Sequence, residues 1–176
     1  GKDVLKRLTL VWQEVKGRAG DLTPLGVRQH QGIAERMTKN FPEVFRGKRS
    51  VSARSTVVYR CAMSMAAFGD RLKGLNPQLD ISYEMSEKYM SYLNYHTDRS
   101  NAFTHGEKGP WVEEYRKFEE QQVKPDRLVN TLFSNADFIR CEVNPNNLMW
   151  GLYWIAVDMQ DIETPVSFYD IFTARE

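Results

Sequence analysis

The sequence predicts a mainly α-helical chain with a small α/β part of about two short strands. Apolar residues recur at three- and four-residue intervals over much of the 176 residues, which is typical of amphipathic helices. Apolar and polar residues alternate only near residues 50–56 and 78–84, as they do in half-buried strands. With 41% hydrophobic and 12% aromatic residues, the chain is able to bury a core of its own.

The first half of the sequence predicts two helices, a strand and a long third helix. The first helix has its apolar residues between Val4 and Val15 and ends near Gly17 or Gly20. Thr23 caps the second helix, with Pro24 at its first position. The inward-facing side chains of the second helix are expected to be Val27, Ile33, Met37 and Phe41. Ser55 or Thr56 is expected to cap the third helix, which Asn76-Pro77 ends. Its apolar stripe consists of Val57, Cys61, Met65, Phe68, Leu72 and Leu75.

The second half begins with a strand and then predicts further helices. Two strands separated by one helix form a βαβ unit. A short helix is expected at residues 86–95 and a loop at 97–110, where turn residues are frequent. The remaining helices are predicted at residues 111–122, 125–134, 145–162 and 165–173, with Asn144 and Thr164 as caps of the last two.

Arg54 is the first candidate for a functional residue, because it stands where the strand near residues 50–56 meets the long helix. Unpaired backbone N–H groups and the helix dipole favour an anion at a helix N-terminus. A guanidinium group there would add two parallel hydrogen bonds to a phosphoryl group. The alternative interpretation is that Arg54 is an ordinary surface arginine at the end of a strand.

A basic loop precedes the same strand and carries Lys48 and Arg49. The functional interpretation is that these cations attract a substrate with several phosphates and raise its on-rate and affinity. The alternative is a solvated turn, which is the common role of such a run.

Two motifs together resemble the histidine acid phosphatase family. The first is Leu-Thr-x-x-Gly-x-x-Gln-His, which runs here from Leu22 to His30. The second is Arg54-Ser55-Thr56, followed on the next helix by Arg60 and Ser64. The sequences of these motifs are most similar to those of the phytase-like branch, the multiple inositol polyphosphate phosphatases, and especially to those of its bacterial members. The close resemblance covers residues 20–77.

The resemblance implies a fold, a reaction and a set of site residues. Residues 1–77 would be part of the α/β phosphatase core and residues 78–176 a helical cap or insertion region, in a single compact unit. The implied reaction is hydrolysis of phosphomonoesters, with inositol polyphosphates as the substrate class, through a phosphohistidine and without a metal or other cofactor. Arg54 would grip the phosphate, and Lys48, Arg49 and Arg60 would bind the substrate. Members of the family are usually exported, which implies a periplasmic or secreted location.

The motifs that carry the family's nucleophile and proton donor are missing from this sequence. Neither Arg-His-Gly-x-Arg nor His-Asp or His-Ala-Glu occurs around His30, His96 or His105. His30 is interpreted as a packing or capping residue, and the other two as solvated. We therefore expect an internal piece of a longer enzyme that is inactive by itself. The alternative is a non-catalytic helical module of similar ancestry that binds an anionic ligand or a protein partner.

Composition narrows the remaining functions. Lys and Arg number 24 against 23 Asp and Glu, so overall charge gives no reason to expect nucleic acid or a membrane surface as a partner. Two cysteines exclude a disulfide framework and a cysteine-rich zinc site, and Cys61 is interpreted as a buried thiol rather than a bridge to Cys141. No apolar run approaches the ~20 residues of a membrane helix. Apolar surfaces left uncovered in such a piece, on the first helix or near Val51, lead to the hypothesis of a dimer.

Overall fold

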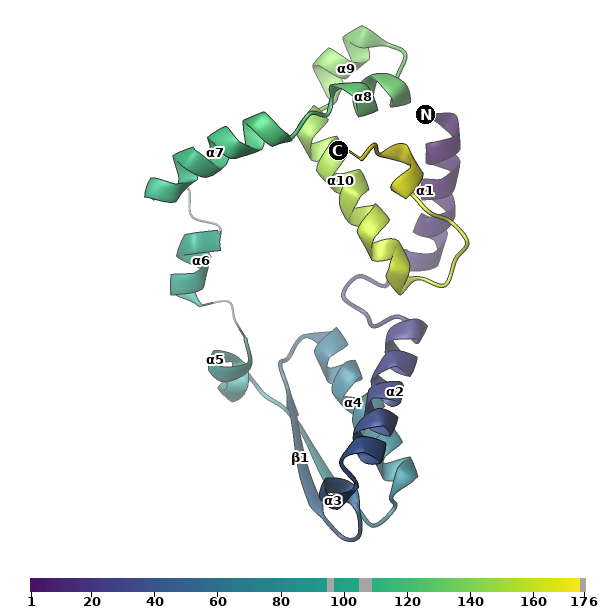
Figure 1. The fold of residues 1–176 in the computed structure, drawn as a ribbon, viewed down its shortest axis with the longest axis vertical. Coiled ribbons are helices and arrows are strands. Elements are labelled where there is room, and N and C mark those ends of the chain that lie inside the picture. Colours follow the sequence, from purple (N-terminus) through teal and green to yellow (C-terminus); the bar gives the residue numbers. More distant parts are fainter. Residues whose placement is uncertain (95–96, 105–108, 175–176) are drawn as a thin grey trace. The chain divides into compact units, whose positions relative to one another are not determined.

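The computed structural model describes residues 1–94, 97–104 and 109–174 and confirms a mainly α-helical fold with a small β component (Figure 1). The chain divides into two compact units, one made of residues 18–102 and the other of residues 1–17 together with 103–176. This division does not follow the expected boundary between residues 77 and 78. The cause is the pairing of the two strands, which keeps residues 80–85 in the same unit as residues 50–55.

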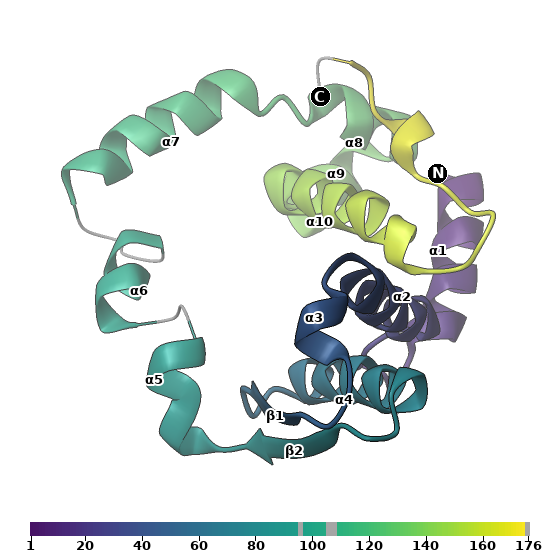
Figure 2. The same cartoon turned by 60° about the horizontal axis from the view of Figure 1, so that its bottom comes forward.

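The unit of residues 18–102 is an α/β unit built around one βαβ connection (Figure 2). Its elements are α2 (Pro24–Asn40), α3 (Pro42–Phe45), β1 (Ser50–Ser55), α4 (Tyr59–Leu75), β2 (Asp80–Met85), η1 (Glu87–Tyr89) and α5 (Met90–Leu93). The strands are parallel, with Ser50 opposite Asp80 and Ser55 opposite Met85. The predicted βαβ unit is therefore confirmed, with each strand within two residues of its expected bounds.

Local signals explain where these helices begin and end. The Thr23 hydroxyl accepts a hydrogen bond from the Gly26 N–H at 3.0 Å, which confirms the predicted cap of α2. The predicted cap of α4 is wrong: its N-cap is Val58, and no side chain caps it. The Ser55 hydroxyl donates instead to the Thr56 carbonyl at 2.9 Å, because Ser55 is still the last residue of the strand.

A small apolar core lies between the sheet and the helices α2 and α4. Its buried members are Ala34, Phe45, Leu72 and Leu79, with Met37, Val51, Phe68 and Ile81 packed against them. Two residues that were expected to face inward, Ile33 of α2 and Phe41 at its C-cap, are exposed by 37% and 50%. Ala34 takes the inward position, because a small residue permits α2 to pack closely on α4.

The second unit is helical in the part that the structure describes. Its elements are α1 (Lys2–Val15), α7 (Pro110–Gln122), α8 (Asp126–Leu132), α9 (Ala136–Glu142), α10 (Pro145–Asp158), η2 (Met159–Asp161) and η3 (Tyr169–Ile171). The Asn144 side chain accepts from the Asn147 N–H and caps α10 as predicted. The helix α6 (Asp98–Thr104) crosses the boundary between the two residue ranges.

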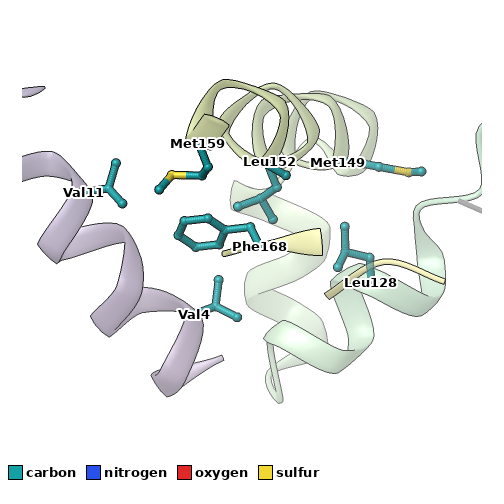
Figure 3. Packing of buried hydrophobic residues seen from close by; sticks show 8 residues of the cluster. Val4, Val11, Leu128, Met149, Leu152, Met159 and Phe168 are labelled. Atoms are coloured by element: carbon teal, nitrogen blue, oxygen red, sulfur yellow. The ribbon is translucent and has the colours of Figure 1, made fainter. Parts of the chain in front are cut away.

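The core of this second unit joins the two ends of the chain. Figure 3 shows the Phe168 ring between side chains of α1 and α10, and Phe168 is completely buried. The other buried members are Val4, Val11, Leu128, Met149, Leu152, Ala156 and Met159. Leu5 and Trp12, on the other side of α1, are exposed by 66% and 60%. A dimer through such surfaces stays a prediction.

Arg7 connects α1 to the C-terminal segment by polar contacts. One of its terminal nitrogens donates to the Ser167 carbonyl at 2.6 Å and to Asp170 Oδ1 at 2.7 Å. The guanidinium also lies 5.3 Å from the centre of the Phe168 ring. Hydrogen bonding to Arg7 lowers the pKa of Asp170 and raises that of Arg7 itself.

Two predicted segments in the second half are wrong. Residues 165–173 do not form a helix beyond the short turn η3, because Phe168 has to enter the core of the unit there. Thr164 accepts a hydrogen bond from the Val166 N–H but starts no helix. Within the expected loop at 97–110, residues 98–104 form α6, and the mutual hydrogen bonds of Thr97 and Ser100 stabilise its beginning.

Candidate functional site

An open cavity of about 480 Å³ lies within the unit of residues 18–102, at the carboxyl end of β1. Four segments line it: the end of β1, one face of α4, α2 and α5. The lining residues are His30, Ala53, Arg54, Ser55, Thr56, Cys61, Ser64, Met65, Phe68 and Leu93. The carboxyl ends of parallel strands are where α/β folds commonly bind ligands.

Arg54 lies at this end of the strand, as the sequence predicts, and its side chain is 49% exposed. Its partner in the strand register is Glu84, and Arg54 Nε lies 3.6 Å from Glu84 Oε2. The guanidinium carbon lies 4.8 Å from the centre of the Tyr89 ring. These two contacts restrict the arginine to one region without burying it.

Glu84 is held more firmly by two other residues than by Arg54. Lys88 Nζ lies 2.8 Å from one carboxylate oxygen, and the Tyr89 hydroxyl donates to the other at 2.8 Å. Hydrogen bonds from Lys88 and Tyr89 lower the pKa of Glu84, and the charges of Lys88 and Arg54 add to this effect. The contact between Arg54 and Glu84 is longer than a hydrogen bond, so the guanidinium keeps donor capacity for an anion.

Thr56 lines the cavity, and its side chain carries a buried oxygen that has no partner among the described residues. Its Oγ1 is buried and makes no hydrogen bond. A buried hydroxyl without a partner costs roughly 1–3 kcal/mol, so such atoms are uncommon unless a ligand or water satisfies them. Because this oxygen has almost no accessible surface, a ligand in the open cavity would reach it only after the Thr56 side chain changes its rotamer.

The structure also brings His30 to this cavity, which the sequence interpretation missed. His30 is half-buried on α2 and lies one helical turn before Ala34, which is completely buried. Residues four apart share a helix face, so the packing of Ala34 carries His30 toward α4. The four-residue spacing of His30 and Ala34 shows that the two residues share a helix face. It predicts the position of His30 at the cavity only when the packing of α2 on α4 is also known.

Lys48 and Arg49 are not brought together with Arg54. Both are exposed and precede β1, whereas Arg54 is near its end, roughly 16 Å farther along at the rise of an extended strand. Asn76, which follows the last residue of α4, donates to the carbonyl of Gly47 at 2.8 Å and fixes this loop there. The two cations therefore lie near the C-terminal end of α4, away from the cavity beside its first turns.

Arg60 lies closer to the cavity than these two residues, although it does not line it. It is the second residue of α4 and is exposed, and its carbonyl accepts a hydrogen bond from the Ser64 hydroxyl at 2.8 Å. Two residues close to Arg60 in the helix line the cavity: Cys61, which follows it directly, and Ser64, which lies one turn later. No side chain caps α4, and the Cys61 N–H donates to the Val58 carbonyl at 2.9 Å, so the N–H groups of Tyr59 and Arg60 are the ones left for an anion there.

The cysteines and the other two histidines do not form a second candidate site among the described residues. Cys61 and Cys141 are free thiols, the first half-buried in the cavity wall and the second exposed. His96 and His105 lie outside the described residues. Within the described ranges, no three His, Cys, Asp or Glu side chains gather as a metal site would require. Among the same residues, no helix combines the length and the apolar character needed to cross a membrane.

Comparison of the chain with models of known protein families gives no match, and comparison with curated proteins gives none either. The resemblance to the histidine acid phosphatases therefore rests on the two motifs alone.

Proposed function

We propose that the chain is part of a histidine acid phosphatase that hydrolyses phosphomonoesters, and that its nucleophilic histidine lies outside these 176 residues. The observation that carries the proposal is the position of Arg54. It stands at the carboxyl end of a parallel strand, in an open cavity, beside a helix N-terminus that no side chain caps. Each of these features favours a phosphate oxygen.

In the proposed reaction, a neutral histidine attacks phosphorus and the bond from phosphorus to the alcohol oxygen breaks. A carboxylic acid gives its proton to the leaving alcohol. Water then attacks the phosphohistidine, and the carboxylate takes the proton of that water as the bond from nitrogen to phosphorus breaks. Arg54 neutralises the equatorial oxygens in both steps, where charge is concentrated in the transition state.

Residues of this chain also have roles in binding the substrate. An N–H of the His30 ring would donate to a phosphate oxygen in the cavity, and the Thr56 hydroxyl would do so after a rotation of its side chain. Arg60, at the edge of the cavity, is placed to meet a second phosphate of an inositol polyphosphate. Lys48 and Arg49 would act on such a substrate only at long range, as charges that steer it. A periplasmic or secreted location belongs to the same proposal.

The test is the kcat/KM of Arg54→Ala in the full-length enzyme, on a simple monoester and on an inositol polyphosphate. We expect a loss of roughly a hundredfold on both substrates, on the order of 3 kcal/mol of transition-state stabilisation. Arg54→Lys should recover part of the rate, because one ammonium does not reproduce the two-point contact of a guanidinium.

Arg49→Ala is the matched control, since it removes an arginine at the other end of the same strand. It should leave the monoester reaction nearly unchanged and raise KM mainly for the polyphosphate, less so at high salt. A loss below about threefold for Arg54→Ala in a folded enzyme, against the hundredfold expected from loss of an oxyanion donor, would make Arg54 an ordinary surface residue. The 176-residue chain alone should be inactive; turnover that depends on His30, His96 or His105 would overturn the assignment of the nucleophile.

The alternative function is a non-catalytic module that binds an anion at the same cavity. The contacts of Arg54 with Glu84 and Tyr89 are compatible with it, because they position the arginine without supplying a nucleophile. The complete reading frame separates the two proposals. The enzyme requires an Arg-His-Gly-x-Arg motif before residue 1 and a His-Asp or His-Ala-Glu motif after residue 176. If the reading frame contains neither motif, the binding module is the remaining proposal.

A further inference from the structure

The second unit contains a groove of about 380 Å³ between α7 and α10, whose chemistry differs from that of the phosphate cavity. Its walls are formed mainly by Tyr115, Phe118 and Glu119 of α7 and by Met149, Trp150 and Tyr153 of α10. On each helix these residues follow spacings of one, three and four, so two helical faces turn their aromatic residues toward the same space.

The aromatic rings are accessible to a ligand. Trp150 and Tyr153 are each 37% exposed, and Tyr115 and Phe118 are 53% and 59% exposed. The rings of Trp150 and Tyr153 are 5.7 Å apart at 87° to one another, so they form two perpendicular walls. Met149 is only 7% exposed and closes the bottom of the groove.

The charged residue that lines the groove is Glu119. No lysine, arginine or histidine lines it, whereas Glu119 does, and that carboxylate is half-buried without a partner among the described residues. The two basic residues of α7 are engaged with other carboxylates: Arg116 with Glu113 at 3.3 Å and Lys117 with Glu114 at 3.1 Å. Aromatic faces are also negative, so both the rings and the carboxylate favour a cation.

We infer that this groove binds an organic cation of the trimethylammonium type, such as a choline group or a methylated lysine. A quaternary ammonium group makes apolar contacts through its methyl groups while its charge faces the rings and Glu119. A compact inorganic cation would lose more hydration than an aromatic wall returns, and an anion would be repelled. The inference does not depend on the proposed phosphatase function, since the two sites lie in different units.

The test compares choline with 3,3-dimethylbutan-1-ol, its neutral carbon isostere, by titration calorimetry on the 176-residue chain. We expect saturable binding of choline that is about tenfold tighter than that of the neutral molecule, the size of a cation–π contribution in a partly desolvated site. The indole N–H resonance of Trp150, followed by NMR, should shift with choline and locate the binding.

Two variants separate a cation site from a general apolar groove. Glu119→Gln should weaken choline binding about fivefold, as loss of a half-exposed charge pair does, and Glu120→Gln, the neighbouring carboxylate outside the groove, should not. Tyr115→Leu keeps an apolar wall but removes a π face, so it should reduce the preference for choline over the isostere. Equal binding of both molecules, equal effects of the two glutamate variants, or no saturable choline binding would each overturn the inference.

Discussion

The two units of this protein bury their cores in different ways. The unit of residues 18–102 is continuous in sequence, and its core cluster, among the described residues, has four buried members between one βαβ connection and α2. The core cluster of the other unit has eight such members and draws them from both ends of the chain, since Val4 and Val11 pack with Leu128 and Phe168. The smaller core supports the cavity at the end of β1, and the larger one supports the aromatic groove. The two candidate sites therefore differ in what forms them: the end of a strand contributes to the cavity in one unit, and two helix faces form the groove in the other.

The largest effects should come from truncating the two cores. Leu72 and Leu128 are each 1% exposed, one in each unit, and alanine at either position should cost about 2–5 kcal/mol. Hydrogen exchange followed residue by residue should show lost protection only in the unit that carries the substitution. Loss of protection across both units from a single substitution would mean that they unfold as one and that the comparison above is mistaken.

The next effect concerns close packing in the unit of residues 18–102. A Cβ atom added at Gly69 of α4 would lie 2.4 Å from the Tyr83 hydroxyl, whereas one at Gly74 would meet nothing within 4 Å. Gly74→Ala should stabilise by up to about 1 kcal/mol through helix propensity. Gly69→Ala should be less stable than Gly74→Ala by about 1–2 kcal/mol, because Tyr83 has to move.

Urea denaturation of both glycine variants measures this difference. Repeating the pair in a Tyr83→Ala background provides the control, since removing the ring should make the two substitutions equivalent. A Gly69→Ala protein as stable as Gly74→Ala, with Tyr83 intact, would show that β2 is not packed against α4 as described.

The smallest effect is the pH dependence of the Arg7 contact in the other unit. Hydrogen bonding to Arg7 holds the pKa of Asp170 below its ordinary 3.8. The stabilisation is therefore complete above pH 3.8 and is lost as the pH falls through the lower pKa of the folded state. Asp170→Asn should cost less than about 1 kcal/mol at neutral pH, since Asp170 is largely exposed, and should flatten this part of the acid profile. An unchanged acid profile for the variant would exclude the contact as a source of stability.

Local signals predicted much of the fold, and long-range packing accounts for the failures. Thr23, Pro24 and Asn144 act within one turn of themselves, so their caps were readable from the sequence. The helix predicted at residues 165–173 begins with Thr164 as its cap and Pro165 at its first position, a good helix start, yet the burial of Phe168 against α1 overrides it. The helix α9 was not predicted because its seven residues are too few to show a period and no proline marks its start, whereas Pro125 marks the start of the equally short α8.

The candidate site was predicted in part for the same reason. Arg54 was identified because the strand end and the helix start are adjacent in the chain. His30 was not, because it reaches the cavity only through the packing of α2 on α4. The grouping of Lys48 and Arg49 with Arg54 followed closeness in sequence, whereas an extended strand separates them in space.

The central claim, that Arg54, Thr56 and His30 form one phosphate site, is tested most directly by titrating the 176-residue chain with inorganic phosphate and following side-chain and backbone resonances by NMR. We predict saturable shifts of the Arg54 Nε–H, the Thr56 amide and the His30 ring with a common dissociation constant, and no comparable shift of Arg49. Shifts that are equal for all exposed arginines, or absent from these three residues, would contradict the account.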